Sequence, residues 1–196
     1  PISDLPRLRL SSVDSIEIDD ALFETMIHDA RFMPHLHLSL QSGDNMILKR
    51  MKRRHSREQA IEFCQKLKEN RPEFVFGADI IAGFPTETDD MFANSVNLLT
   101  EIGIIYGHIF PYSPRSGTPA ARMPQIAKDV IKRRAAILRQ TSEQLLSEYY
   151  QSLIGKVIHC VSEADGYLRS ETFVRLWSDT PTEHGTLYKV RVTDLS

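Results

Sequence analysis

The chain has 196 residues, of which 41% are hydrophobic and 26% are charged, as is ordinary for a globular protein. This length allows one substantial core or one and a half domains. The formal net charge of -2 excludes a global basic field, so nucleic-acid binding has to be argued from local clusters. No apolar run approaches the ~20 residues that span a bilayer, and no signal peptide is visible.

The only cysteines of the sequence, Cys64 and Cys160, lack metal-type spacing. Such sparse usage argues against an extracellular disulfide framework and favours a reducing, cytoplasmic location. Cys64 lies in a helical apolar stripe and Cys160 in a β run, and both patterns predict core thiols. The first residue is Pro1, which fits either removal of an initiator Met or a sequence that begins within a longer protein.

Strand and helix patterns alternate along the first part of the chain. The expected elements are a strand at 7–11, a helix at Asp20–Ala30, a strand at His35–Gln41, a short helix at Asp44–Met51, a helix capped by Ser56 that ends near Asn70, a strand at Phe74–Ala82, a helix at Asp89–Ile102 and a strand at Tyr106–Tyr112. This β-α-β-α order predicts a parallel sheet with helices covering one side.

The first two strands alternate between leucine and polar residues, whereas most parallel strands are apolar on both faces. The leucines are expected to pack against the helices. The opposite face then carries Arg7, Arg9, His35, His37, Ser39 and Gln41. A polar barrel interior is poorly suited to a packed core and well suited to a lined cavity. A solvated sheet face is the alternative.

After a loop at Pro111–Pro124, the periodicity predicts one long helix over Ile126–Leu153, roughly 40 Å in length. Gly155 is suited to end it. Short β runs follow at Val157–Val161, Thr172–Trp177 and Leu187–Val192. We therefore expect a first domain at residues 1–154 and a small, incomplete β domain at residues 155–196, which is thin for an independent core.

Five segments occur in a distinctive order: Arg9–Ser12, His35–Gly43, Met51–Arg53, Asp79–Thr88 and Phe110–Ala120. This series resembles the later part of the radical S-adenosylmethionine (SAM) core of the methylthiotransferases. Residues after Gly155 resemble the RNA-binding TRAM domain that follows this core. The motif Gly-Phe-Pro-Thr-Glu-Thr at 83–88 favours the methylthiotransferases that act on tRNA threonylcarbamoyladenosine. The branches that act on isopentenyladenosine and on a ribosomal protein are near neighbours.

The resemblance implies an α/β fold, a partial TIM-like (βα) barrel that holds SAM and a 4Fe-4S cluster at the carboxyl ends of its strands. It implies SAM-binding residues near the ribose and methionyl group (Ser39, Gln41, Ser42), at the carboxylate (Arg53) and beside the adenine (Ile81, Gly83, Phe110, Tyr112). A guanidinium suits a planar carboxylate, and the small Gly83 would let the backbone approach a ligand closely. Serine and glutamine at a strand end can instead simply cap the loop.

The family's cluster requires a Cys-x-x-x-Cys-x-x-Cys loop, whose three thiolates hold three of the irons. Two isolated cysteines cannot supply it. The resemblance therefore predicts an inactive fragment of an enzyme that adds a methylthio group to C2 of threonylcarbamoyladenosine near the anticodon of tRNA. The alternatives are a noncatalytic RNA-binding remnant, a methylthiotransferase of a ribosomal protein, and a TIM-type enzyme that uses His37 and Asp79 as acid and base.

Two further clusters carry competing interpretations. The basic run Lys49–Arg57 could contact tRNA phosphates or form a solvated helix end. His35 and His37 could both bind a metal, but with no third ligand evident nearby, hydrogen-bonded cavity histidines are favoured.

Two further predictions concern surfaces that could bind RNA or another copy of the chain. Phe173 and Trp177, with Arg175 on the same face of an expected strand, could stack RNA bases, although a small β core is favoured. Strand edges left exposed by a half-barrel also predict self-association of the chain.

Overall fold

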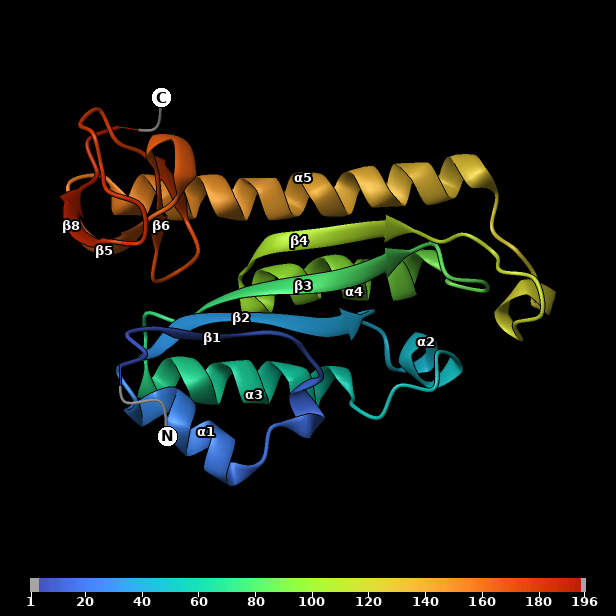
Figure 1. Cartoon of the computed structure of the whole chain (residues 1–196). Coiled ribbons are helices and arrows are strands. Elements are labelled where there is room, and N and C mark those ends of the chain that lie inside the picture. Colours follow the sequence, from blue (N-terminus) through green and yellow to red (C-terminus); the bar gives the residue numbers. More distant parts are fainter. Residues whose placement is uncertain (1–3, 195–196) are drawn as a thin grey trace.

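The structure, a computed structural model, describes residues 4–194 and contains two four-stranded sheets (Figure 1). The first is parallel, in the order β1-β2-β3-β4, and consists of β1 (Leu8–Val13), β2 (Phe32–Gln41), β3 (Val75–Ala82) and β4 (Ile104–Pro111). The second is antiparallel, in the order β7-β6-β5-β8, and consists of β5 (Val157–Ser162), β6 (Tyr167–Ser170), β7 (Arg175–Trp177) and β8 (Leu187–Arg191). This confirms the predicted partial α/β barrel followed by a small β unit.

Helices connect these strands where the sequence predicts them. They are α1 (Asp20–His28), α2 (Asn45–Arg50), α3 (Arg57–Asn70), α4 (Asp89–Ile102) and α5 (Lys128–Leu153), with short 3-10 helices η1 (Ser15–Glu17), η2 (Ala120–Arg122) and η3 (Ala164–Gly166). Ser56 caps α3 in a reciprocal capping box with Gln59, as expected from its position before the helix. Within residues 4–194, no helix combines the length and apolar character needed to cross a membrane.

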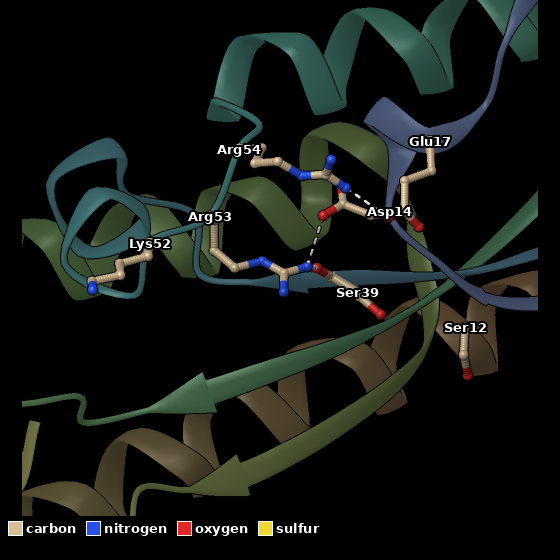
Figure 2. Close-up of a pocket in the computed structure, with 7 residues that line it drawn as sticks. All are labelled: Ser12, Asp14, Glu17, Ser39, Lys52, Arg53 and Arg54. Atoms are coloured by element: carbon tan, nitrogen blue, oxygen red, sulfur yellow. Dashed lines mark hydrogen bonds and ion pairs between the residues drawn. The ribbon is translucent and has the colours of Figure 1, made fainter. Parts of the chain in front are cut away.

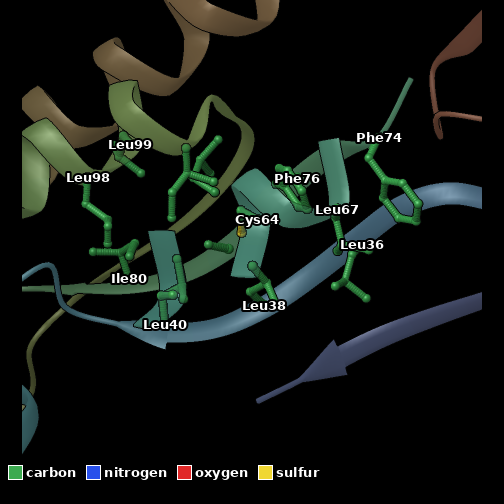
Figure 3. Packing of buried hydrophobic residues seen from close by; sticks show 14 of the residues in the cluster. Leu36, Leu38, Leu40, Cys64, Leu67, Phe74, Phe76, Ile80, Leu98 and Leu99 are labelled. Carbon is green, nitrogen blue, oxygen red and sulfur yellow. The ribbon is translucent and has the colours of Figure 1, made fainter. Parts of the chain in front are cut away.

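One face of the parallel sheet forms the main hydrophobic core. Alternate residues of β2 and β3 point into it (Leu36, Leu38, Leu40, Phe76, Ala78 and Ile80), and α3 and α4 cover them with Cys64, Leu67, Leu98 and Leu99 (Figure 3). Burying each large apolar side chain stabilises the fold by roughly 1.5–3 kcal/mol. The predicted leucine face of the second strand and both core thiols are confirmed, since Cys64 is 1% and Cys160 0% exposed.

Two parts of the predicted pattern are wrong. Leu8 is 46% exposed, because register shifts along the pairing of β1 with β2 interrupt the alternation. The expected strand Thr172–Trp177 is also shorter than predicted: β7 begins at Arg175, and Phe173 adopts a left-handed conformation with φ 70°. The sequence pattern did not reveal β6, which precedes that turn.

The turn between β6 and β7 contacts the polar face of the parallel sheet. Arg9 Nη2 donates to the carbonyls of Ser170 at 3.2 Å and Glu171 at 3.0 Å. The Tyr106 hydroxyl lies 3.4 Å from the carbonyl of Thr172. Although Gly155 falls between α5 and β5, these contacts tie the two sheets together, so a domain boundary at residue 155 stays a prediction.

The two edges of the parallel sheet differ. At β4, α5 supplies Ser142, whose hydroxyl accepts from Gly107 N at 2.8 Å and donates to the Ile104 carbonyl at 3.3 Å. Arg139 also donates to the carbonyl of Ile109 at 3.1 Å. Within residues 4–194, no strand pairs with the outer edge of β1. The helix therefore covers one edge, and the other remains open to pairing.

A buried ion pair ties the loop after β3 to α5. Arg134 Nη1 donates to the Glu87 carboxylate at 2.8 Å and to the Glu87 carbonyl at 2.9 Å, and the two side chains are 6% and 1% exposed. The same carboxylate accepts from Gly83 N at 3.1 Å. Burial raises the pKa of Glu87, and the charge of Arg134 opposes that rise. Removing Arg134 would therefore leave a buried carboxylate without its counter-charge.

We expect Arg134→Met to lower the free energy of unfolding by about 3–5 kcal/mol, because breaking a buried pair leaves one charge uncompensated. The neighbouring Arg133 is exposed on the same helix, so Arg133→Met should change stability by less than about 0.5 kcal/mol. Urea unfolding followed by circular dichroism measures both. Equal effects of the two substitutions would contradict this account.

We also expect the chain to self-associate through the outer edge of β1. Light scattering during size-exclusion chromatography should give a mass above that of one chain, rising with concentration. Ser11→Lys should lower it, because a charged side chain on an edge strand opposes pairing. Ser147→Lys, an exposed position on α5, is the matched control. A single-chain mass at every concentration would refute the prediction.

Candidate functional site

A cavity of about 250 Å³ lies near the carboxyl ends of β1 and β2. Its lining residues are Ser12, Asp14, Glu17, Ser39, Lys52, Arg53 and Arg54 (Figure 2). They come from the end of β1 and η1, from β2 and from the loop after α2. Ligands of α/β proteins commonly bind at this end of the strands, so the position suits a binding site.

Arg53 is held across this cavity by two acceptors. Its Nη2 donates to the Asp14 carboxylate at 3.0 Å and to the Ser39 carbonyl at 2.7 Å (Figure 2). Its Nε is buried and has no hydrogen-bond partner among residues 4–194. Arg53 and Ser39, both predicted for the site, are thus brought together, and the guanidinium is fixed in the cavity wall.

Asp14 and His55 are parts of this arrangement that sequence reasoning missed. The Asp14 carboxylate lies 3.1 Å from His55 Nδ1, and His55 Nε2 lies 3.2 Å from the Leu40 carbonyl. Asp14 therefore joins η1 to the loop that carries Arg53. The available signal was the histidine inside the basic run, whose burial to 4% exposure could not be read from its charged neighbours.

The predicted residues at the end of β2 have mixed positions. Ser42 is 1% exposed, and its hydroxyl accepts from Asp44 N at 3.2 Å and lies 3.4 Å from the Ser95 hydroxyl. Gln41 has a left-handed backbone with φ 68°. Neither lines the cavity. Ser42 thus accepts a hydrogen bond within its own loop and lies close to Ser95 of α4, and its SAM contact stays a prediction.

The four residues predicted beside an adenine lie on β3, β4 and the segments that follow them. Ile81 is opposite Phe110 in the sheet register, and Phe110 is 51% exposed. The buried Tyr112 hydroxyl has no partner within the described part of the chain. Gly83 has φ 76°, and a side chain there would lie 2.6 Å from Ile131 of α5. The structure therefore gives a packing reason for this glycine, and the ligand approach stays a prediction.

A second cluster occupies the middle of the polar face. His37 Nε2 lies 2.9 Å and His108 Nδ1 lies 3.3 Å from the same Asp79 oxygen, Oδ1. Asp79 and His108 are opposite each other in the register of β3 and β4. Gly77 makes room for the His37 ring, because a Cβ there would lie 2.5 Å from His37 Nδ1. The predicted hydrogen-bonded state of His37 is confirmed, and His108 was missed.

His35 has a different environment at the beginning of β2. Its ring stacks on Phe173 at 4.9 Å and meets the edge of Tyr106 at 5.5 Å. Burial, followed by the nearby charge of Arg9, lowers the pKa of His35 to about 3, so this ring is neutral near pH 7. His35 is therefore an aromatic contact between the two sheets rather than a partner of the His37 cluster.

The aromatic residues of the small sheet do not form the β core that the sequence favoured. Phe173 covers the polar face of the parallel sheet, with the guanidinium of Arg9 4.8 Å from its ring centre. Trp177 is 62% exposed and contacts Tyr167 edge-on at 5.1 Å, while the Arg175 guanidinium lies 3.5 Å from the Tyr167 ring centre. The small core instead contains Leu153, Val174 and Val192.

Much of the basic run is already paired with carboxylates. Arg54 contacts Glu17 at 2.6 Å, Arg57 contacts Glu101 at 2.6 Å, and Arg53 and His55 share Asp14. This local neutralisation reduces the charge available to a phosphate backbone. Three residues of the run, Lys52, Arg53 and Arg54, form part of the cavity wall.

Comparison with known proteins shows which domain and which fold the chain resembles. Residues 12–99 match the radical SAM superfamily. In fold, the chain resembles coproporphyrinogen III oxidase (HemN) from Escherichia coli, a radical SAM enzyme, with a TM-score of 0.53 at 16% identity over 76% of this chain and 39% of that one. Residues 12–99 thus resemble a radical SAM domain, and the fold of the chain is similar to that of a radical SAM enzyme.

Three curated proteins are similar to the chain in sequence. The chain is 50% identical over 194 residues to the threonylcarbamoyladenosine tRNA methylthiotransferase MtaB of Rickettsia prowazekii (strain Madrid E), covering 99% of this chain and 46% of that protein. It is 34% identical to MtaB of Aquifex aeolicus (strain VF5), covering 97% and 47%. It is 41% identical to the tRNA-2-methylthio-N(6)-dimethylallyladenosine synthase of Orientia tsutsugamushi (strain Ikeda), covering 84% and 37%.

In sequence, the chain therefore resembles part of an MtaB-like tRNA methylthiotransferase. It spans about half the length of the MtaB relatives it matches. The residues present do not fit a 4Fe-4S cluster, because the only two cysteines of the sequence lie buried in α3 and β5. No chemistry through a cluster is therefore assigned to residues of this chain.

We expect Gly77→Ala to destabilise the chain by about 1–3 kcal/mol, the usual cost of overpacking, because the added methyl group meets the His37 ring. In a His37→Ala background, the same substitution should cost less, since the closest contact is removed and the Tyr106 carbonyl oxygen at 3.0 Å and Tyr106 Cβ at 3.1 Å remain. A double-mutant cycle by urea unfolding measures this coupling. The same cost in both backgrounds would show that His37 is not the reason for the glycine.

Proposed function

We propose that this chain provides part of the SAM-binding barrel and an RNA-contacting β unit of a tRNA methylthiotransferase that modifies threonylcarbamoyladenosine at C2, near the anticodon. The observation that carries this proposal is the 50% identity, over 99% of the chain, to a protein of that name. The chain by itself is expected to be inactive, because its sequence has two cysteines and no cluster-binding triad. A cytoplasmic setting, where tRNA and free thiols coexist, fits this role.

The methionyl part of SAM is a zwitterion, and the cavity beside Arg53 has charges of both signs. Arg53 lines this space as a fixed cation that suits a carboxylate, while Asp14 and Glu17 line the same space and can attract an ammonium group. The residues present therefore fit this part of SAM. In the complete enzyme, SAM would supply the radical that removes hydrogen from C2 of the modified adenosine.

The remaining predicted contacts extend the proposal along the strand ends. Ile81 and the half-exposed Phe110 offer apolar surface for the adenine, and Tyr112 follows directly after β4. Gln41 and Ser42 would contribute through the loop after β2, and Gly83 through its position between β3 and α4.

The RNA-contacting role rests on the exposed aromatic group of the small sheet. Trp177 is 62% exposed, and Arg175 lies against Tyr167 beside it. Exposed aromatic and guanidinium planes stack on unpaired bases, which suits the loop of a tRNA. Because this surface needs no cluster, it equally supports the second candidate, a noncatalytic RNA-binding remnant.

A chimera tests the proposal. The matching 194 residues of the Rickettsia prowazekii relative are replaced by this chain, and the protein is expressed in cells whose own gene for this activity is deleted. Mass spectrometry of tRNA nucleosides should detect methylthio-threonylcarbamoyladenosine. Arg53→Met in the chimera should lower the product by roughly tenfold or more, because a charge-assisted hydrogen bond contributes ~1.5–3 kcal/mol.

Arg54→Met is the matched control, since Arg54 lines the same cavity but pairs with Glu17 at its exposed rim. The control should retain product. Methylthio-dimethylallyladenosine in place of the expected nucleoside would transfer the proposal to the other tRNA branch. A folded chimera that binds tRNA without modifying it would support the binding remnant.

A further inference from the structure

A group with metal-ligand chemistry lies on the polar face of the parallel sheet, apart from the cavity that holds Arg53. The group is the His37–Asp79–His108 cluster, with one residue from each of β2, β3 and β4. His37 Nε2 and His108 Nδ1 lie 2.9 and 3.3 Å from Asp79 Oδ1, and all three atoms are within 4.8 Å of one another. We propose that this cluster binds a divalent transition-metal ion of the Zn²⁺ type.

The donor set supports this assignment. Two imidazoles and one carboxylate form the three-ligand set of open zinc sites, which keep a fourth position for water or substrate. Bond lengths of roughly 2.0–2.2 Å place ligand atoms about 3–4 Å apart around one ion. The 3.3 Å from His108 Nδ1 to Asp79 Oδ1 lies in this range and the 2.9 Å from His37 Nε2 is just below it, so small side-chain shifts suffice. His108 can make them, because its side chain is 62% exposed.

The rest of the sheet holds the ligands in place. The absence of a side chain at Gly77 lets the His37 ring lie over β3, towards Asp79. Asp79 is fixed opposite His108 by the parallel register. Two of the three ligands are therefore well enclosed, with side-chain exposures of 9% for His37 and 25% for Asp79. Ligands fixed on rigid strands lose little entropy when an ion binds.

Without an ion, both ring nitrogens compete for the same carboxylate oxygen. The His37 and His108 rings are 4.4 Å apart, so both N–H groups would converge on Asp79 Oδ1. One cation in their place uses the lone pairs of both rings and the charge of the carboxylate. Arg9 is occupied elsewhere, because its Nη2 donates to the carbonyls of Ser170 and Glu171.

This site is chemically separate from an iron–sulfur cluster. Its ligands are nitrogen and oxygen, whereas such clusters are held chiefly by thiolates, and neither cysteine of the sequence lies on this face. The inference rests on the measured geometry of three residues and does not depend on the proposed transferase function. It extends the sequence prediction, which found two histidines and no third ligand.

The test uses the full chain without a polyhistidine tag, after treatment with a chelator. Calorimetric titration with Zn²⁺ should show one ion per chain, and Co²⁺ should give the visible spectrum of a site of low coordination number. Asp79→Asn and His108→Gln should each weaken Zn²⁺ binding by more than the roughly 10–100-fold that loss of an outer-shell partner costs. His28→Gln, at the exposed His28–Glu24 pair, is the matched control and should bind normally.

Thermal unfolding separates loss of the site from loss of the fold. Zn²⁺ should raise the Tm of the native chain and of His28→Gln, because a ligand that binds the folded state stabilises it. It should not raise the Tm of His108→Gln, which alters an exposed side chain and should fold normally. No Zn²⁺ binding by the native chain, or undiminished binding by both Asp79→Asn and His108→Gln, would overturn the proposal and leave a hydrogen-bonded cluster.

Discussion

The constraint on which this structure depends is a parallel sheet with one apolar and one polar face. Parallel sheets are usually covered on both sides, because backbone and side chains there are removed from water. Here α3 and α4 bury the leucine face, while the other face carries histidine, aspartate and arginine. A polar group buried on that face is costly without a hydrogen-bond partner. The contacts that supply such partners account for much of the remaining architecture.

The small sheet provides partners for polar residues at the amino-terminal end of the polar face. Its turn supplies two carbonyls to Arg9 and places the Phe173 ring against His35. This explains why residues that resemble an RNA-stacking strand take part in an internal contact instead. The exposed aromatic surface that remains, around Trp177, is correspondingly smaller than the sequence suggests.

Helix α5 supplies hydrogen-bond partners to the β4 edge of the parallel sheet, as the small sheet supplies them to its polar face. Ser142 bonds to both Gly107 N and the Ile104 carbonyl, and Arg134 anchors the loop after β3. The glycines at 83 and 107 permit this approach, since a Cβ at either would meet α5 within 3 Å. One helix therefore positions β4 and the loop after β3, and β1 is left as the open edge.

Sequence patterns predicted the features that depend on local chemistry. Alternation in β2, the cap at Ser56 and the order of the family segments need only neighbouring residues. The failures depend on distant contacts or local irregularities. The bulges in β1 expose Leu8, the left-handed Phe173 ends the expected strand, and Asp14 reaches Arg53 only after the chain has folded. His108 was missed because its partner, Asp79, belongs to another strand.

Alternate residues along β2 run from the small sheet, past the proposed metal cluster, to the cavity of Arg53. Successive inward residues of β2 are His35, His37 and Ser39, and alternate residues of a strand are about 7 Å apart. The first contacts the small sheet, the second belongs to the proposed metal cluster, and the third lines the cavity of Arg53. An ion on Asp79 would thus lie about one layer from the proposed SAM contacts. Its charge would act on that cavity across a partly buried strip, where screening by water is weak.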